Sequence, residues 1–242
     1  MPPIAVSQDE LKKFGDLWKE NNQSLPKKRP LLSDVFDSTV ANSLAAMLGG
    51  IPHVETTKKD LIPPQADCVE RGLVRVIGGV RPQNFDVGYR PDGIRFAFDS
   101  KTLNDTASVK KNYQNMINDL STEATTVHSR FPYALVAFMV IIPEPCLLKA
   151  QRAALIETLD RLGRRRSIVD PPYLAEVATL VLWDPDTGEI DPQVPAASHI
   201  RIEQFSELVS RVYTERYKGL PPHADIGKEA EEAMEEKDDL TS

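Results

Sequence analysis

Cysteine and histidine are scarce in this chain of 242 residues. Its two cysteines, Cys68 and Cys146, are too few and too far apart to indicate a disulfide framework or a structural zinc site. Its four histidines are scattered and form no metal-binding pattern. The chain also lacks a P-loop, a G-x-G-x-x-G fingerprint and a G-x-S-x-G elbow. These absences argue against nucleotide hydrolysis, dehydrogenation and serine hydrolase chemistry.

Long apolar runs are missing as well. No run approaches the roughly 18 residues that a membrane span requires. The opening Met1-Pro2-Pro3-Ile4 lacks the basic and apolar regions of a signal peptide. We therefore expect a cytoplasmic protein without a membrane partner, and the apolar content of 41% is ample for a packed core.

Positive charge is in deficit, with a net charge of −7, but the deficit is local. Residues 225–242 contain eight acidic and two basic side chains, so the other 224 residues carry a net charge of about −1. Basic clusters on such a neutral body can still present a positive face to a polyanion. We expect this acidic tail to be disordered and dispensable for activity.

Residues 84–101 predict a β-hairpin. Pro91-Asp92-Gly93 supplies the turn, because proline presets φ and glycine tolerates a positive φ. Side chains alternate between the two faces of a strand, so the apolar residues of both runs share one face. These residues are Phe85, Val87, Tyr89, Ile94, Phe96 and Phe98.

Burying both apolar sets together requires a register that places Asp86 opposite Asp99. Directly opposed carboxylates repel each other across a strand pair, so a positive charge is needed nearby. Lys101, two residues beyond Asp99, supplies one such charge. Two converging aspartates also suit Mg²⁺, which is held by one or two carboxylates, water and phosphate oxygens. A salt bridge on a solvated face and a metal site therefore remain as alternatives.

An aspartate on one strand, followed by Asp99-x-Lys101 on the next, resembles the motif of the PD-(D/E)xK nuclease superfamily. The resemblance covers about residues 60–145 and departs from the motif at Phe85, where proline is usual before the first aspartate. It implies a core with an antiparallel meander, Asp86 and Asp99 as ligands of Mg²⁺, and Lys101 as a third catalytic residue. It also implies an acid on the helix before the meander, for which Glu70 is the candidate.

The matching class of this length is the type II restriction endonuclease, commonly a homodimer that cuts a short symmetric site in double-stranded DNA. A repair or junction-resolving nuclease would share the motif. A non-catalytic DNA-binding or interaction protein on a degenerate core would need no metal. Gln114 is followed four residues later by Asn118 and not by the tyrosine of the exonuclease branches, which argues against that branch.

The fold class predicted is α/β, with a mixed sheet built on the antiparallel meander and flanked by helices. One domain spans residues 1–224, with a helical part over 1–50, the catalytic core over about 60–145 and an α/β part over 146–220. Apolar periodicity and end signals predict helices over about 8–20, 33–48, 66–70, 105–127, 148–162 and 203–217. Strands are expected over 73–77, the two arms of the hairpin, 132–142 and 174–183.

Two further segments are candidate DNA contacts. Arg164, Arg165 and Arg166 lie at a predicted helix end, where they would either contact phosphates or compensate the helix dipole. The helix after Lys101 carries polar side chains outside its apolar stripe. Those expected to face DNA are Lys110, Lys111, Gln114 and Asn115.

Overall fold

The computed structural model describes residues 1–26, 31–190, 194–218 and 220, without the side chains of Ser108 and Lys110. The acidic tail therefore lies outside the described residues. In the described part of the chain, no helix is both long and apolar enough to cross a bilayer. The fold is α/β, as predicted.

A six-stranded mixed sheet forms the centre of the molecule, and its spatial order β1-β2-β3-β4-β5-β6 follows the chain. The strands are β1 (His53–Thr56), β2 (Val69–Ile77), β3 (Pro82–Tyr89), β4 (Phe96–Thr102), β5 (Leu135–Pro143) and β6 (Val177–Trp183). β2, β3 and β4 form the antiparallel meander, whereas β1 runs parallel to β2, and β4, β5 and β6 run parallel to one another. Every residue of β5 and β6 is buried, as expected for strands covered on both faces.

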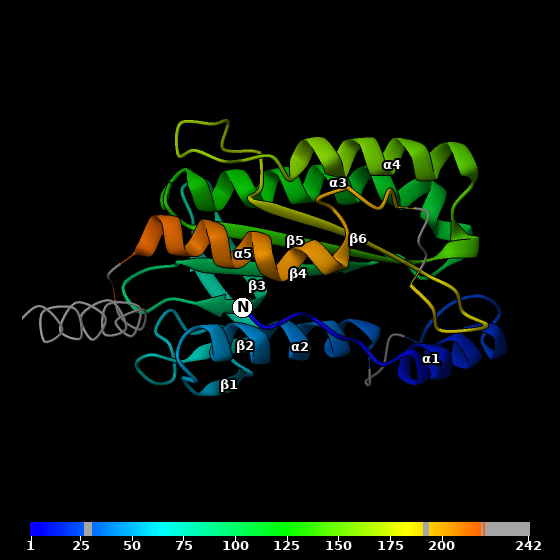
Figure 1. The fold of residues 1–242 in the computed structure, drawn as a ribbon, viewed down its shortest axis with the longest axis horizontal. Coiled ribbons are helices and arrows are strands. Elements are labelled where there is room, and N and C mark those ends of the chain that lie inside the picture. Colours follow the sequence, from blue (N-terminus) through cyan, green and yellow to red (C-terminus); the bar gives the residue numbers. More distant parts are fainter. Residues whose placement is uncertain (27–30, 191–193, 219, 221–242) are drawn as a thin grey trace, which may run out of the picture.

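Helices cover both faces of this sheet (Figure 1). They are α1 (Gln8–Glu20), α2 (Leu32–Met47), α3 (Thr106–His128), α4 (Lys149–Leu162) and α5 (Ile202–Tyr217), with a 3₁₀ turn over Glu144–Cys146. α3 and α4 lie on one face, and α2 and α5 lie on the other. Phe98 packs edge-on against Phe205 of α5, whereas Lys101 reaches Glu123 of α3, so alternate residues of β4 serve the two layers.

The segment before the meander differs from expectation. No helix spans residues 66–70, because β2 already begins at Val69, and the short parallel strand β1 was not predicted. The register of β2 against β3 shifts between Arg71 and Val74, around Gly72 with its φ of 117°. This β-bulge lets the strand bend. It also interrupts the alternation of side chains between the two faces of β2, so the first residues of the strand do not show the pattern that predicts a strand.

Beyond the bulge, the β2–β3 hairpin turns toward α3. The backbone N–H of Gly79 donates to the carbonyl of Thr126 at 2.8 Å, and Arg130 donates to the carbonyl of Ile77 at 3.0 Å. A Cβ on Gly78 would lie 2.4 Å from the carbonyl oxygen of Thr126, so only glycine permits this approach. The far end of the meander is therefore fixed against the C-terminal end of α3.

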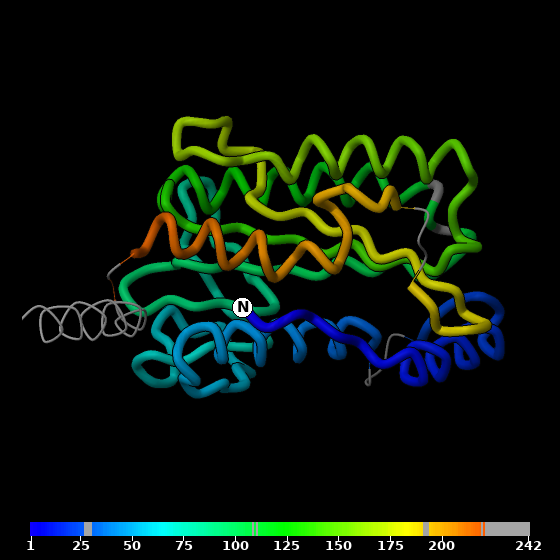
Figure 2. Tube along the Cα trace, viewed as in Figure 1, coloured from blue at the N-terminus to red at the C-terminus, as the bar shows by residue number. Residues whose placement is uncertain are grey.

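The N-terminal helix α1 docks on the turn that follows β6, at the opposite end of the sequence. The chain starts beside α5 and runs from there to α1 (Figure 2). At this start, Ser206 of α5 donates to the carbonyl of Pro2 at 2.7 Å. Gln8 donates to the carbonyl of Thr187 at 3.1 Å, and Lys19 pairs with Asp186 at 2.9 Å. Gly15 permits this docking, because a Cβ there would lie 1.9 Å from the carbonyl oxygen of Pro185.

We predict that Gly15→Ala destabilises the protein. In an ordinary helix interior, this change stabilises by about 0.5–1 kcal/mol. Here the added methyl group collides with the Pro185 carbonyl, and we expect a loss of about 1–3 kcal/mol in the free energy of unfolding. Urea unfolding of the variant beside Lys13→Ala, on an exposed position of α1, measures the difference. A stabilised Gly15→Ala protein would show that α1 does not dock in this way.

Candidate active site

The β3–β4 hairpin brings the two aspartates of the motif together. The ladder pairs Val87 with Phe98 and Tyr89 with Phe96, and one further step in this register sets Asp86 opposite Asp99. There the ladder ends, and Oδ2 of Asp86 accepts from the backbone N–H of Ser100 at 2.9 Å and from its hydroxyl at 3.2 Å. The predicted opposition of the two carboxylates is confirmed, and their role as metal ligands stays a prediction.

Lys101 joins this pair, as the motif requires. Its ammonium forms an ion pair with Asp99 and a second one with Glu123 of α3, in which Nζ and Oε1 are 2.9 Å apart. Gln83 donates to the same Oε1 at 3.0 Å. Glu123 thus orients Lys101 from the neighbouring layer and is itself held in place.

Burial and mutual repulsion disfavour two negative charges at this point. Burial, followed by the charge of Asp99, raises the pKa of Asp86 to about 8. Burial also raises the pKa of Asp99 to about 7, although Lys101 opposes this shift. Burial alone would lower the pKa of Lys101, but Asp99 and Glu123 hold it above its ordinary value. The pair therefore has a deficit of positive charge at neutral pH that a cation would relieve.

A third carboxylate approaches from the other layer of the fold. Asp37 of α2 is 7% exposed, and its Oδ1 has no hydrogen-bond partner. Burial, followed by the charge of Asp86, raises its pKa well above the ordinary value, while a hydrogen bond with Ser100 opposes the shift. Asp37 and Asp86 both line a cleft of about 400 Å³ between α2, β1 and the bulge of β2. This cleft gives the carboxylates a route to solvent.

Glu70 does not contact this cluster, and the expectation that it lies on a helix is wrong. It lies on β2, not on a helix, and is fully buried. Its carboxylate receives both Nε and Nη2 of Arg90, at 2.6 and 2.7 Å, in a two-pronged ion pair. The acid on the helix before the meander is instead Asp37.

Asp37 and Glu123 were missed because the motif does not include them. Each is nonetheless marked in the sequence as an acid on the apolar stripe of an amphipathic helix. Asp37 stands three residues before Val40, and Glu123 stands three residues after Leu120 and four before Val127. Because i, i+3 and i+4 positions share a helix face, an acid on such a stripe is buried and needs a partner.

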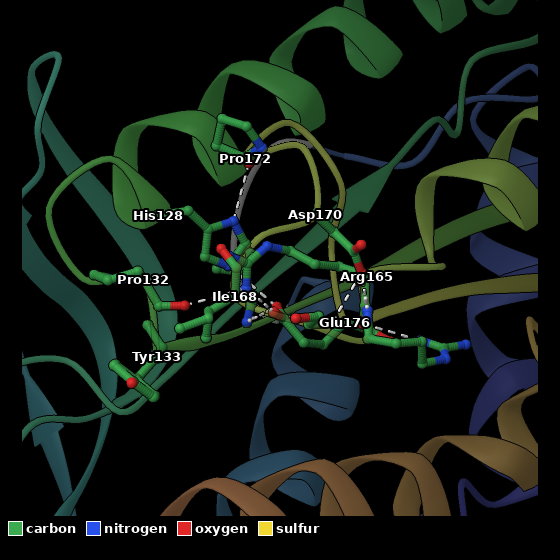
Figure 3. A network of polar contacts seen from close by, with 12 residues as sticks. His128, Pro132, Tyr133, Arg165, Ile168, Asp170, Pro172 and Glu176 are labelled. Atoms are coloured by element: carbon green, nitrogen blue, oxygen red, sulfur yellow. Dashed lines mark hydrogen bonds and ion pairs between the residues drawn. The ribbon is translucent and has the colours of Figure 1, made fainter.

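The arginines after α4 do not form the predicted DNA contact as a group. Arg165 is 1% exposed and points inward, where it pairs with Glu176 at 2.6 Å and donates to the carbonyls of Pro132 and Ile168 (Figure 3). It cannot reach a phosphate from this position. Arg164 is at the surface and pairs with Asp160 one helical turn earlier. This position at the end of α4 fits the alternative in which the arginine compensates the helix dipole.

Among the remaining candidate contacts, those whose side chains the structure describes are exposed. Arg166 lies at the surface, and burial, Arg211 and Arg164 lower its pKa, so several cations gather there. Lys111, Gln114 and Asn115 are exposed on α3. Lys110 belongs to the same helix, but its side chain is outside the described residues.

Glu176 is the centre of a buried charged network that fixes five chain segments. Besides Arg165, it receives Arg216 of α5 at 2.8 Å, His128 of α3 at 3.2 Å and the backbone N–H of Val136 at 2.8 Å. Burial would raise the pKa of Glu176, but His128 and Arg216 together with these hydrogen bonds lower it to about 2. This network ties the ends of α3 and α5 to the starts of β5 and β6.

The residues present fit an open magnesium site, in which the protein supplies only some of the ligands. Asp86 and Asp99 supply two carboxylates where the strands separate, and Asp37 adds an oxygen that lacks a donor. Within the described ranges, no group of three or more histidine, cysteine or acidic side chains is arranged to hold a metal ion. This donor set matches a hard cation completed by water and phosphate oxygens, not a closed protein site.

Comparison with known proteins adds no relative. No protein-family model matches the sequence, and no curated protein or solved structure is detectably similar to it.

We predict that Asp86→Asn makes the protein more stable than wild type, by a margin that grows as the pH rises. The pKa of Asp86 is raised from 3.8 to about 8 in the folded protein, so the wild-type protein loses stability as the pH rises across this interval. Over this range the carboxyl ionises readily only in the unfolded chain. Asparagine still accepts from Ser100 but does not ionise. We expect the free energy of unfolding at pH 8 to rise by about 1–3 kcal/mol, allowing for screening. Denaturant melts of wild type, Asp86→Asn and the exposed Asp119→Asn over this pH range test it. Parallel pH profiles would contradict it.

Glu176→Gln should have the opposite effect. The change leaves Arg165 and Arg216 buried without their counter-charge, for which we expect a loss of about 3–5 kcal/mol at pH 7. Because the pKa of Glu176 is lowered to about 2, the wild-type stability that it supplies is complete above 4.5 and declines as the pH falls toward 2. Thermal unfolding beside Glu157→Gln, at an exposed position of α4, measures both effects. An unchanged melting temperature would mean that the network is not stabilising.

Proposed function

We propose that this protein is a Mg²⁺-dependent endonuclease that hydrolyses phosphodiester bonds of double-stranded DNA. The observation that carries the proposal is the meeting of Asp86 and Asp99 at the point where β3 and β4 separate, with Lys101 paired to Asp99. The type II restriction endonuclease is the class that this arrangement resembles.

Each residue of the cluster has a defined part in this reaction. Asp86 and Asp99 would hold the cation, and Asp37 would be a third carboxylate near it. A bound Mg²⁺ supplies an activated water and neutralises charge on the scissile phosphate. Lys101 orients the attacking water and favours its deprotonated form, since a nearby positive charge stabilises hydroxide. Glu123 keeps the Lys101 ammonium in this position.

The partner proposed is DNA, and the active species proposed is a homodimer, as is usual for enzymes that cut symmetric sites. Lys111, Gln114 and Asn115 on the exposed side of α3, together with Arg166, offer phosphate and base contacts. The body that carries them has a net charge close to neutral. Binding should therefore depend on these local groups and weaken steeply with salt.

A second candidate is a DNA-binding protein without catalysis. Asp99 is only 6% exposed, and Lys101 pairs with both Asp99 and Glu123, so these charges also stabilise one another without a metal. Digestion of a plasmid of known sequence with Mg²⁺ separates the possibilities. Discrete bands favour a restriction enzyme, cleavage without a fixed site favours a repair or junction-resolving nuclease, and binding without cleavage favours the non-catalytic protein.

The nuclease proposal predicts different defects for Asp99→Asn and Lys101→Ala. Asp99→Asn should lower cleavage in Mg²⁺ by at least about 100-fold, the scale expected for loss of one catalytic group. DNA binding should be unchanged or tighter, because a negative charge near the phosphate is removed. Lys101→Ala should lose cleavage to a similar extent but keep metal binding. Plasmid cleavage, gel-shift affinity and Mn²⁺ titration measure the three quantities.

Asp119→Asn on the exposed side of α3 is the matched control, and it should cut normally. Circular dichroism establishes that each variant is folded. A folded Asp99→Asn protein that cuts at the wild-type rate would mean that the aspartates form only an ion-paired structural cluster.

A further inference from the structure

A second concavity lies on the α3 side of the meander, away from the cleft that Asp37 and Asp86 share. It has a volume of about 380 Å³, and its walls come from the end of β2, the β3–β4 turn, the loop before β2 and the residues after α3. Three arginines line it, Arg75, Arg90 and Arg130, and none of the described lining residues is acidic. In a chain of net charge −7, this is a locally cationic pocket.

Two of these arginines are positioned without a carboxylate partner. Arg130 donates from Nη1 to the carbonyl of Ile77 at 3.0 Å, and its guanidinium lies 5.4 Å from the ring centroid of Phe131. Arg75 donates from Nη1 to Oδ1 of Asn84 at 3.3 Å. Along the described chain, no ion pair joins either of them to an acid. A guanidinium has five N–H donors, so each retains capacity for an anion.

The third arginine has a different part. Arg90 is buried and neutralised by Glu70, and it also donates to the carbonyls of Arg75 and Asp60, at 2.8 and 3.0 Å. These bonds fix the backbone of Arg75 and of the loop that precedes β2. The pocket wall is therefore organised in advance by a buried ion pair and does not depend on a ligand.

The remaining walls are apolar and open. Ile62 is 78% exposed and Leu61 is 56% exposed, and both stand on the loop that Arg90 holds. Phe131 packs over Gly93, whose φ of 118° and lack of a side chain let the ring lie close. An isolated anion would leave these apolar side chains uncovered, and a purely apolar ligand would leave the arginines unpaired. A flat, apolar group that carries an anion satisfies both.

We propose that this pocket binds one nucleoside monophosphate unit, with its phosphate on Arg75 and Arg130 and its base against Ile62, Leu61 and Phe131. Arginine binds phosphate in a planar, two-pronged geometry, and bases pack on aromatic and apolar surfaces. The volume lies within the range of small-molecule sites, about 300–1,000 Å³.

The unit has two sources, a free nucleotide or a nucleotide extruded from a DNA strand. Asn84, which accepts from Arg75, lies two residues before Asp86 on β3, so one strand links the pocket to the proposed catalytic cluster. The DNA source rests on the proposed nuclease function, whereas the binding of a free nucleotide does not. An extruded base would let the protein inspect a strand beside the scissile phosphate.

The test is binding in EDTA, where metal-dependent cleavage cannot interfere. Calorimetry with deoxyadenosine monophosphate, deoxyadenosine and inorganic phosphate measures the free-nucleotide arm. Fluorescence of 2-aminopurine opposite an abasic site in a duplex, where extrusion is least costly, measures the DNA arm. We expect the monophosphate to bind at least about tenfold more tightly than the nucleoside or phosphate. A rise in 2-aminopurine fluorescence assigns the DNA source, and calorimetric binding alone assigns the free nucleotide.

Variants make the assignment specific. Arg75→Gln/Arg130→Gln should weaken binding in the responding arm at least about tenfold, and Ile62→Asp should do the same through its charge, at a position exposed enough to tolerate it. Arg161→Gln, an exposed arginine of α4, is the control and should bind as wild type. No saturable response in either arm, or binding unchanged in the double variant, overturns the proposal. Plasmid cleavage by the same proteins in Mg²⁺ reports separately on the nuclease function.

Discussion

The repulsion between two buried carboxylates is the constraint on which the rest of this structure depends. Asp86 and Asp99 face each other because the apolar residues of the hairpin are buried together in only one register. At that point β3 leaves β4, and two neighbouring residues compensate: Ser100 donates to Asp86, and Lys101 pairs with Asp99. Glu123 adds a negative charge but holds the Lys101 ammonium in place. Apolar residues of similar size would often stabilise such a buried position as well or better, so the presence of the pair points to a site.

The layers of the fold serve this cluster in different ways. The meander supplies the aspartates and lysine, α3 supplies Glu123, and α2 supplies Asp37. The bulge in β2 bends the hairpin toward α3 and leaves the opening beside Asp86. The Glu176 network fixes the ends of α3 and α5 and the start of β5 and β6 (Figure 3), so the helix that carries Glu123 is anchored at its C-terminal end.

Much of this arrangement was predictable from local patterns. Alternation of apolar residues and the Pro91-Asp92-Gly93 turn determine the register, and hence the meeting of Asp86 and Asp99. The expectations of a helix at Glu70 and of an exposed Arg165 were wrong for one reason. Each is a charged residue whose partner, Arg90 or Glu176, is distant in sequence, so its burial has no local signal. The strand β1 has four residues and no alternation of apolar side chains, so only its pairing with β2 defines it.

The docking of α1 on the turn after β6 has a consequence for how the chain reaches this structure. Strands that neighbour each other in the sheet also neighbour each other along the chain, so most of the sheet can assemble through short loop closures. The contacts of Gln8 with Thr187 and of Ser206 with Pro2 instead close loops of 179 and 204 residues. The entropic cost of closing these long loops is offset only when the sheet already exists. We therefore expect the N-terminal helix to join late and to detach early, whereas the hairpin with its paired aspartates needs only a short loop closure.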